Sequence, residues 1–132
     1  MTSRVSVIIP AFGNDAALAL SLATLRAQTL SAAEIIIVDD GSKMPIPPQE
    51  GCTVTRLERE PVHRGSSAAK NHGASLARGD YLCFADSDIL HVHDALESLL
   101  LSMHKWEDEN EPDILLNTMR VSLPDGYKAK YL

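Results

Sequence analysis

Two acidic motifs, Asp39-Asp40-Gly41-Ser42 and Asp86-Ser87-Asp88, follow apolar runs over residues 34–38 and 81–85 that have the composition of buried strands. A third motif, Pro10-Ala11-Phe12, follows a similar run. In an open parallel sheet the carboxyl ends of the strands meet at one edge, where ligands bind. We therefore expect four carboxylates to gather there, as oxygen ligands for a divalent cation and a phosphate-bearing partner.

Asp86-Ser87-Asp88 has a spacing that suits a bridge between a metal ion and a phosphate. Mg²⁺ and Mn²⁺ are commonly held by one or two carboxylates together with phosphate oxygens of the substrate. The cation would neutralise charge on a departing diphosphate. Asp-Ser-Asp is also common turn chemistry. Its position directly after a buried strand is what favours the metal site.

Two further segments suit a ligand at the same edge. A carboxylate of Asp39-Asp40 can accept the N–H of a pyrimidine or bond a sugar hydroxyl, and Gly41 lets the backbone approach closely. The alternative is a turn in which Asp bonds local amides. Gly65 precedes a helix start, which suits anion binding through free amides, with Lys70 and Asn71 able to face the edge. A capped helix with a solvated lysine is the alternative there.

The elements that must position these motifs alternate along the chain. Apolar patterning predicts strands at residues 5–9, 34–38, 52–57, 81–85 and 113–118, and helices at about 15–28, 66–77 and 92–105, with a possible hairpin over 119–131. Pro10 is expected to end the first strand, because proline cannot donate to the ladder. The alternation predicts a parallel sheet sandwiched by helices.

Composition limits the classes of function. At 132 residues the chain is one domain, and 45% hydrophobic with 23% charged residues is ordinary for a globular protein. A formal charge of −6 argues against nucleic-acid binding. Without a secretory signal, Cys52 and Cys83 are expected to be reduced. No apolar run approaches the ~18 residues of a membrane span. These features predict a cytoplasmic protein, with a peripheral position at the membrane as the alternative for the full-length form.

Taken in order, the motifs resemble those of a known family. The residues that carry the resemblance are Val5-Ser6-Val7-Ile8-Ile9-Pro10-Ala11-Phe12, Gln28-Thr29, Ile36-Ile37-Val38-Asp39-Asp40-Gly41-Ser42, Gly65–Gly73 and Gly79–Asp88. They are similar to the amino-terminal half of inverting GT-A glycosyltransferases, which include cellulose, chitin and hyaluronan synthases. The resemblance implies a three-layer α/β/α, Rossmann-like fold with a mainly parallel sheet. Residues 1–132 would then be a truncated, amino-terminal part of a nucleotide-sugar-binding domain.

The resemblance also implies roles for individual residues. The nucleotide sugar would be bound by Pro10, Ala11, Phe12, Asp39, Asp40, Lys70, Asp86 and Ser87. The backbone of the first three would line the base pocket, and Asp40 would meet the base with Asp39 beside it. Lys70 would lie near the nucleotide or its diphosphate. Asp86 would lie near the nucleoside sugar, and Asp88, with Asp86, would hold Mn²⁺ or Mg²⁺.

Such enzymes transfer a sugar from a nucleotide donor, here expected to be a UDP-sugar, to an acceptor hydroxyl with inversion, assisted by an aspartate base. The acceptor, a glycan, lipid or protein, is left open. The base is expected beyond Leu132, so the 132-residue chain is expected to bind donor without turning it over. Gly13 and Lys70 depart from the family's usual asparagine and arginine, which bears on donor affinity.

Several alternatives remain open at this stage. Glu107-Asp108 looks like the family's later Glu-Asp pair, but it comes early, and we interpret it as part of a solvated loop. His91 and His93 can reach a metal or simply flank a helix start. The chain can be a non-catalytic nucleotide-binding or scaffold module. A nucleotidyltransferase is the weaker rival, because residues 11–15 lack a cation. Self-association through an exposed sheet edge is a further hypothesis.

Overall fold

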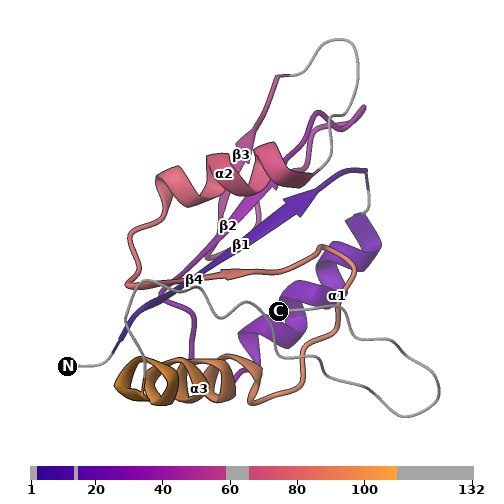
Figure 1. Cartoon of the computed structure of the whole chain (residues 1–132). Helices are drawn as coiled ribbons and strands as arrows, with labels where there is room; N and C mark the ends of the chain where they lie inside the picture. Colours follow the sequence, from indigo (N-terminus) through magenta and orange to yellow (C-terminus); the bar gives the residue numbers. More distant parts are fainter. Residues whose placement is uncertain (1–2, 14, 59–65, 110–132) are drawn as a thin grey trace.

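The computed structural model describes residues 3–13, 15–58 and 66–109 (Figure 1). Its elements are β1 (Val5–Ala11), α1 (Asp15–Arg26), β2 (Glu34–Asp39), β3 (Thr53–Arg56), α2 (Ser66–Leu76), β4 (Tyr81–Phe84) and α3 (Ala95–Glu109). The strand predicted at 113–118 and the hairpin at 119–131 lie outside the described residues. The other predicted strands and helices are all present, with boundaries that differ by a few residues.

The four strands form one parallel sheet in the order β3-β2-β1-β4. β1 lies inside the sheet, where Ala11 pairs with Asp39 of β2 and Ile8 pairs with Phe84 of β4. Because both faces of the sheet are covered, all seven residues of β1 are buried, and its sequence is a nearly continuous apolar run rather than an alternating pattern. The predicted parallel α/β sheet is confirmed.

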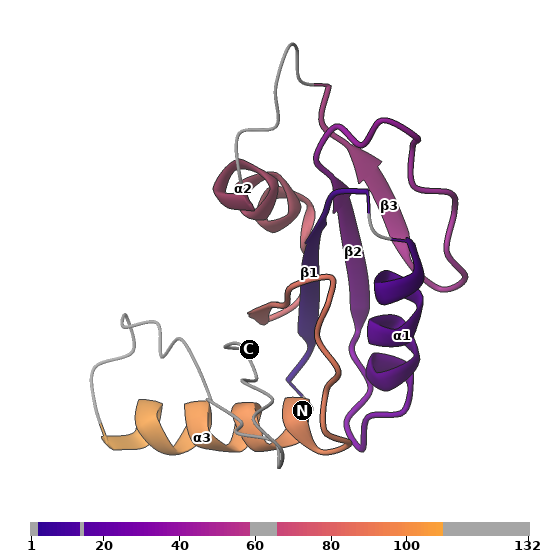
Figure 2. The same ribbon diagram turned by 90° about the vertical axis from the view of Figure 1, so that its right-hand side faces the viewer.

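Helices cover both faces of this sheet, as Figure 2 shows for α2 on one face and α1 on the other. Alternate strand residues supply the two cores, because successive side chains point to opposite faces. One core joins strand residues to leucines of α1 and to the start of α3, and includes Val7, Ile9, Ile35, Ile37, Leu18, Leu22, Leu25 and Leu96. The other, under α2, consists of Ile8, Ile36, Val38 and Ala69. The three-layer arrangement follows directly from this pattern.

Pro10 does not end the first strand, contrary to the sequence prediction. β1 continues to Ala11, and Pro10 is paired with Val38 of β2. The amide of Ala85 donates to the carbonyl of Ile8, so the backbone polar groups of Ile8 point toward β4. The backbone of Pro10, two residues further along β1, points to the same side. β4 has already ended at Phe84. Pro10 therefore lacks an N–H only on the side of β4, where no strand residue remains to accept a hydrogen bond.

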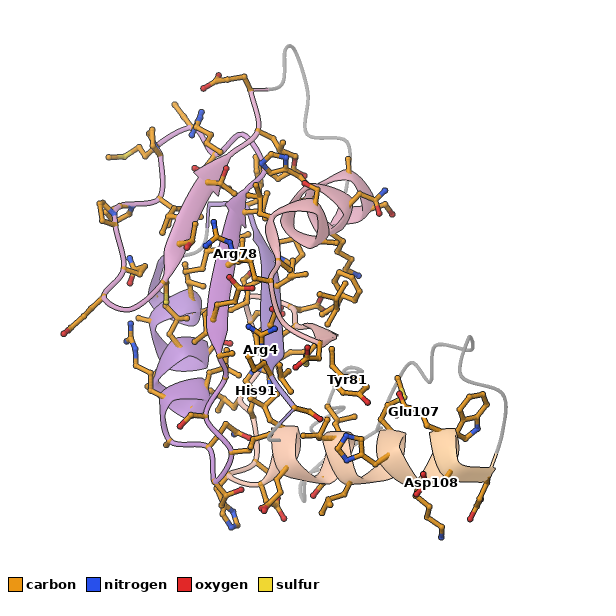
Figure 3. The ribbon with its side chains drawn as sticks, turned by 90° about the vertical axis from the view of Figure 1, so that its left-hand side faces the viewer. Arg4, Arg78, Tyr81, His91, Glu107 and Asp108 are labelled. Atoms are coloured by element: carbon orange, nitrogen blue, oxygen red, sulfur yellow. The ribbon has the colours of Figure 1, made fainter. Side chains whose placement is uncertain are left out.

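The prediction that Glu107 and Asp108 lie in a loop is also wrong. α3 continues to Glu109, so both residues belong to its last turns. The hydroxyl of Tyr81 donates to Glu107 Oε2 at 2.7 Å. Figure 3 labels both side chains, one from β4 and the other from α3. This bond raises the pKa of Tyr81 to about 12. Glu107 therefore has a packing role, because it fastens the end of α3 to the start of β4.

Candidate functional site

The acidic motifs lie at the same edge of the sheet, the one formed by the carboxyl ends of the strands. Asp39 is the last residue of β2, and Asp40 follows it. Asp86 and Asp88 follow the end of β4, and β1 lies between these two strands. Asp40 is almost fully buried, whereas Asp86 is half-buried and Asp88 is exposed. The edge thus carries acidic groups from both strands that flank β1.

Asp39 is the centre of a buried hydrogen-bond network. Its Oδ1 accepts the amide of Ser42 at 2.9 Å, and its Oδ2 accepts the amide of Ile46 and Arg56 Nη1, both at 3.0 Å. Burial by itself raises the pKa of Asp39, but these hydrogen bonds and the Arg56 charge outweigh it and lower the pKa below its ordinary 3.8. Asp39 is therefore a carboxylate whose charge is already compensated within the protein.

A second link joins the loop after β1 to the loop after β2. The amide of Gly13 donates to Ser42 Oγ at 2.9 Å, and the amide of Asp40 donates to the carbonyl of Ala11 at 2.9 Å. Gly13 has a φ of +59°, a conformation that favours glycine. The loops on which Phe12 and Asp40 lie are thereby held in fixed relative positions.

Sequence reasoning missed Arg56 and Ile46 as parts of this edge. Arg56 meets Asp39 because β2 and β3 pair in a register that puts the two residues opposite each other. No short motif reports that register. For Ile46, the only available signal was a carboxylate followed by a turn, which commonly bonds nearby amides.

The segment after Asp86-Ser87-Asp88 is fastened to α1 and to the residues just after it. Gln28, buried past the end of α1, donates through Nε2 to the carbonyl of Val92 at 2.6 Å and accepts the amide of Leu96 through Oε1 at 3.0 Å. The amide of His91 donates to Thr24 Oγ1 at 3.0 Å. Gln28 thus provides an acceptor for a free amide in the first turn of α3. It also holds the segment between the acidic turn and α3 against the end of α1.

His91 contacts α1. Its imidazole is buried, and Nε2 lies 3.4 Å from Ser21 Oγ. Burial lowers the pKa of His91 to about 4, because the charged form is poorly solvated there. The alternative that His91 flanks a helix start fits this environment. His93 is exposed, and its carbonyl accepts the amide of Thr29.

We expect His91 to make stability depend on pH in acid. Between about pH 6.5 and pH 4 the unfolded chain binds a proton at His91 that the folded chain does not, so stability falls as pH falls. His91→Gln should lose about 2 kcal/mol less unfolding free energy than the parent between about pH 7 and pH 4.5. Urea unfolding at both pH values measures this difference. Parallel pH profiles for parent and variant would contradict the expectation.

The other predicted ligand residues lie around the same edge. Pro10 and Ala11 are buried, whereas Phe12 is 48% exposed. α2 follows β3 and begins at this edge, and half-buried Lys70 lies in its first half. Ser87 is half-buried between the two aspartates of its motif. Contact of any of these residues with a nucleotide sugar stays a prediction.

No group of three or more His, Cys, Asp or Glu side chains within the described residues is arranged to hold a metal ion. This does not conflict with a Mg²⁺ or Mn²⁺ site, because these cations are usually bound through one or two carboxylates, with water and substrate phosphate supplying the other ligands. Asp86 and Asp88 provide such a pair of hard oxygen donors. The residues present therefore fit a cation that arrives with a diphosphate.

Comparison with known proteins agrees with this geometry. A family model described as "Glycosyl transferase family 2" matches residues 6–111. The chain belongs to glycosyl transferase family 2. Among curated relatives, it is 33% identical over 97 residues to an uncharacterized glycosyltransferase of Haemophilus influenzae, a match that covers 72% of this chain and 33% of the relative. The chain spans less than half the length of the first curated relatives it matches.

Solved structures of other proteins share the fold. The mannosyltransferase PcManGT of Pyrobaculum calidifontis, in complex with GDP-Man and Mn²⁺, has a TM-score of 0.67 at 22% identity, covering 96% of this chain and 38% of PcManGT. Residues 1–349 of S. aureus TarS, in complex with UDP, give a TM-score of 0.63 at 18% identity, covering 93% and 43%. The expected GT-A-like fold is therefore confirmed. The narrower group with cellulose, chitin and hyaluronan synthases stays a prediction.

The cysteines and the helices bear on the expected location of the protein. Cys52 and Cys83 are both free thiols. None of the helices in the described part of the chain has the length and apolar character needed to cross a membrane. The cytoplasmic location stays a prediction.

Proposed function

We propose that this chain forms the donor-binding part of a metal-dependent, inverting glycosyltransferase that uses a UDP-sugar. The observation that carries the proposal is the position of the two acidic motifs on the strands that flank β1, at one edge of a family 2 fold. A nucleotide diphosphate laid across this edge would meet a base-binding side at the end of β2 and a diphosphate-binding side at the end of β4.

The base-binding side is formed by the loops after β1 and β2. Asp40 accepts the ring N–H of the base, a hydrogen bond that a uracil can donate. The backbone at Pro10, Ala11 and Phe12 borders the base, and Asp39 lies beside Asp40. TarS, which shares the fold, was solved with UDP. PcManGT was solved with GDP-Man, so guanine is the competing base that an experiment has to separate from uracil.

The diphosphate-binding side is formed by the turn after β4 and by α2. Asp86 lies near the nucleoside sugar, with Ser87 beside it, and Asp88, together with Asp86, is the ligand pair for Mn²⁺ or Mg²⁺. When bound, the cation offsets negative charge on the diphosphate leaving group. Lys70 adds a positive charge that attracts the phosphates without the bidentate geometry of arginine. The acceptor hydroxyl attacks the anomeric carbon from the face opposite the diphosphate. The bond to the diphosphate breaks, the nucleoside diphosphate leaves, the hydroxyl proton goes to the aspartate base expected beyond Leu132, and the configuration is inverted.

Calorimetric titration with UDP, GDP, CDP and ADP, with and without Mn²⁺, tests this proposal. We expect one nucleotide, UDP, to bind at least tenfold more tightly than the others, and only when Mn²⁺ is present. Asp40→Asn should reduce the preference for UDP by about tenfold, because the amide presents a donor as well as an acceptor to the base.

Asp80→Asn is the matched control, because it makes the same charge change at the opposite end of β4, where Asp80 pairs with Arg4 at 3.4 Å. Nucleotide affinity should be unchanged in this variant. If Mn²⁺ strengthens the binding of none of the four nucleotides, the proposed function is wrong.

A further inference from the structure

The carboxylate of Asp39 is held by several groups of the protein itself. Its two oxygens accept three hydrogen bonds, from the amides of Ser42 and Ile46 and from Arg56, and the residue is 1% exposed. A ligand group that bound Asp39 would have to displace one of these donors. Displacement would leave a buried N–H or a guanidinium without its acceptor, which is energetically unfavourable. The hydrogen bonds of Asp39 therefore serve to fix the local backbone conformation rather than to bind a ligand.

The hydrogen bonds of Asp39 fix the conformation of the two loops that follow β1 and β2. Asp39 fixes the backbone of Ser42, and Ser42 Oγ in turn accepts the amide of Gly13. We call Asp39, Ser42 and Arg56 the edge brace. Through the brace, one buried carboxylate sets where Gly13 lies relative to Asp40, whose own amide is bonded to Ala11.

Arg56 is the part of the brace that comes from a different strand. Its side chain is about one-third exposed. Arg56 Nη1 donates to Asp39 Oδ2 at 3.0 Å, and Arg56 Nε lies 3.4 Å from Oε1 of the largely exposed Glu58. Without Arg56, Asp39 would keep two amide donors but lose its compensating charge in a buried position. Breaking one partner of such a pair is strongly unfavourable. We expect the loop after β2 to change its conformation in response, because residues 40–46 form neither strand nor helix.

The acidic turn after β4 is held by other residues. Its following segment is fastened by Gln28 and by contacts of His91 with α1. None of these contacts involves a residue of the brace. A change in the brace should therefore move the base-binding side of the edge and leave the diphosphate-binding side in place.

We propose that the edge brace positions the nucleobase-binding loops, so that Arg56 determines base selectivity without touching the ligand. This inference rests on the proposed function, and it assigns Asp39 a positioning role. Arg56 and Ser42 become specificity-determining residues for the donor base. The diphosphate contributes affinity that does not depend on the brace.

The test compares base selectivity with pyrophosphate affinity in the full-length protein. We would measure dissociation constants for UDP, GDP and inorganic pyrophosphate, each with Mn²⁺, well below the unfolding temperature. Arg56→Met keeps the aliphatic stem and removes the charge and the hydrogen bond. We expect it to reduce the ratio of UDP to GDP affinity about tenfold and to change pyrophosphate affinity less than twofold. Arg56→Lys should recover part of the ratio, because it restores the charge with one donor group.

Two further variants keep the test informative. Ser42→Ala removes the link to Gly13 while leaving the Ser42 amide on Asp39, so it should lower the base ratio even if Arg56→Met folds poorly. Arg26→Met is the control, because it makes the same substitution at the end of α1, where Arg26 Nη2 donates to the carbonyl of Glu50 at 2.6 Å. It should leave both the ratio and the pyrophosphate affinity unchanged.

The possible failures are distinguishable. If the parent protein shows no Mn²⁺-dependent nucleotide binding, the proposed function is wrong, and the role of the brace falls with it. If the parent is selective and Arg56→Met and Ser42→Ala keep that selectivity, only the positioning role is overturned. An equal loss of nucleotide and pyrophosphate affinity in Arg56→Met would also overturn it, because the effect would then be general loosening of the edge.

Discussion

Asp88→Asn should lower the rate of sugar transfer by the whole enzyme about 100- to 1,000-fold. The asparagine side chain is nearly the same size but carries no negative charge, so a divalent cation loses one of its two carboxylate ligands. Charge stabilisation by a bound cation contributes several kcal/mol to such a reaction, which corresponds to this range of rates. The affinity for a nucleoside diphosphate should also stop depending on Mn²⁺, which calorimetry measures without turnover.

Asp108→Asn is the matched control for this prediction. Asp108 is exposed in the last turns of α3, and it belongs to the Glu-Asp pair that resembles a family motif. Transfer and nucleotide binding should be unaffected by its replacement. If Asp108→Asn were as damaging as Asp88→Asn, the assignment of the cation to the turn after β4 would have to be abandoned.

Gly79→Ala should destabilise the fold by about 3 kcal/mol, at the upper end of the range for overpacking. An added Cβ at Gly79 would lie 2.8 Å from the amide nitrogen of Ser6 and 2.9 Å from the carbonyl oxygen of Arg4. Both are backbone atoms of or next to β1, so neither can rotate away. The Gly79 amide also donates to Ser6 Oγ at 2.8 Å, a bond that the displaced turn would lose. Thermal unfolding should shift down by about 10 °C.

Gly51→Asn serves as the comparison. Nothing lies within 4 Å of a Cβ added at Gly51, and asparagine tolerates its φ of +70° better than most residues. Its unfolding temperature should change by no more than a few degrees. A Gly79→Ala variant as stable as Gly51→Asn would mean that the turn before β4 can move away from β1.

The strands and their order of appearance could be predicted because each is a short Val/Ile-rich run followed by turn chemistry. The common edge for the acidic motifs followed from the parallel arrangement alone. The different environments of Asp39 and Asp40 could not be predicted in the same way. They depend on the register between β2 and β3, which brings Arg56 opposite Asp39, and register is a property of two distant segments rather than of either one.

Local rules also gave two wrong boundaries. Pro10 was expected to stop β1, but the rule concerns a missing donor, and only the sheet order reveals that β4 ends before that donor would be needed. The polar pattern at Glu107 and Asp108 indicates a loop, but α3 continues to Glu109, and the Tyr81 hydroxyl of β4 donates a hydrogen bond to Glu107. In both cases a tertiary contact decided what the local pattern left ambiguous.

The central place of β1 has a consequence for how the protein is made. β1 precedes the other three strands of this sheet along the chain, but its second neighbour, β4, begins only at Tyr81. At typical translation rates the 69 residues between Ala11 and Tyr81 take roughly 3 to 14 s to synthesise. During that interval one side of an apolar strand stays without its native hydrogen-bonding partner. Nascent chains halted before Tyr81 should therefore be the forms that molecular chaperones retain most strongly.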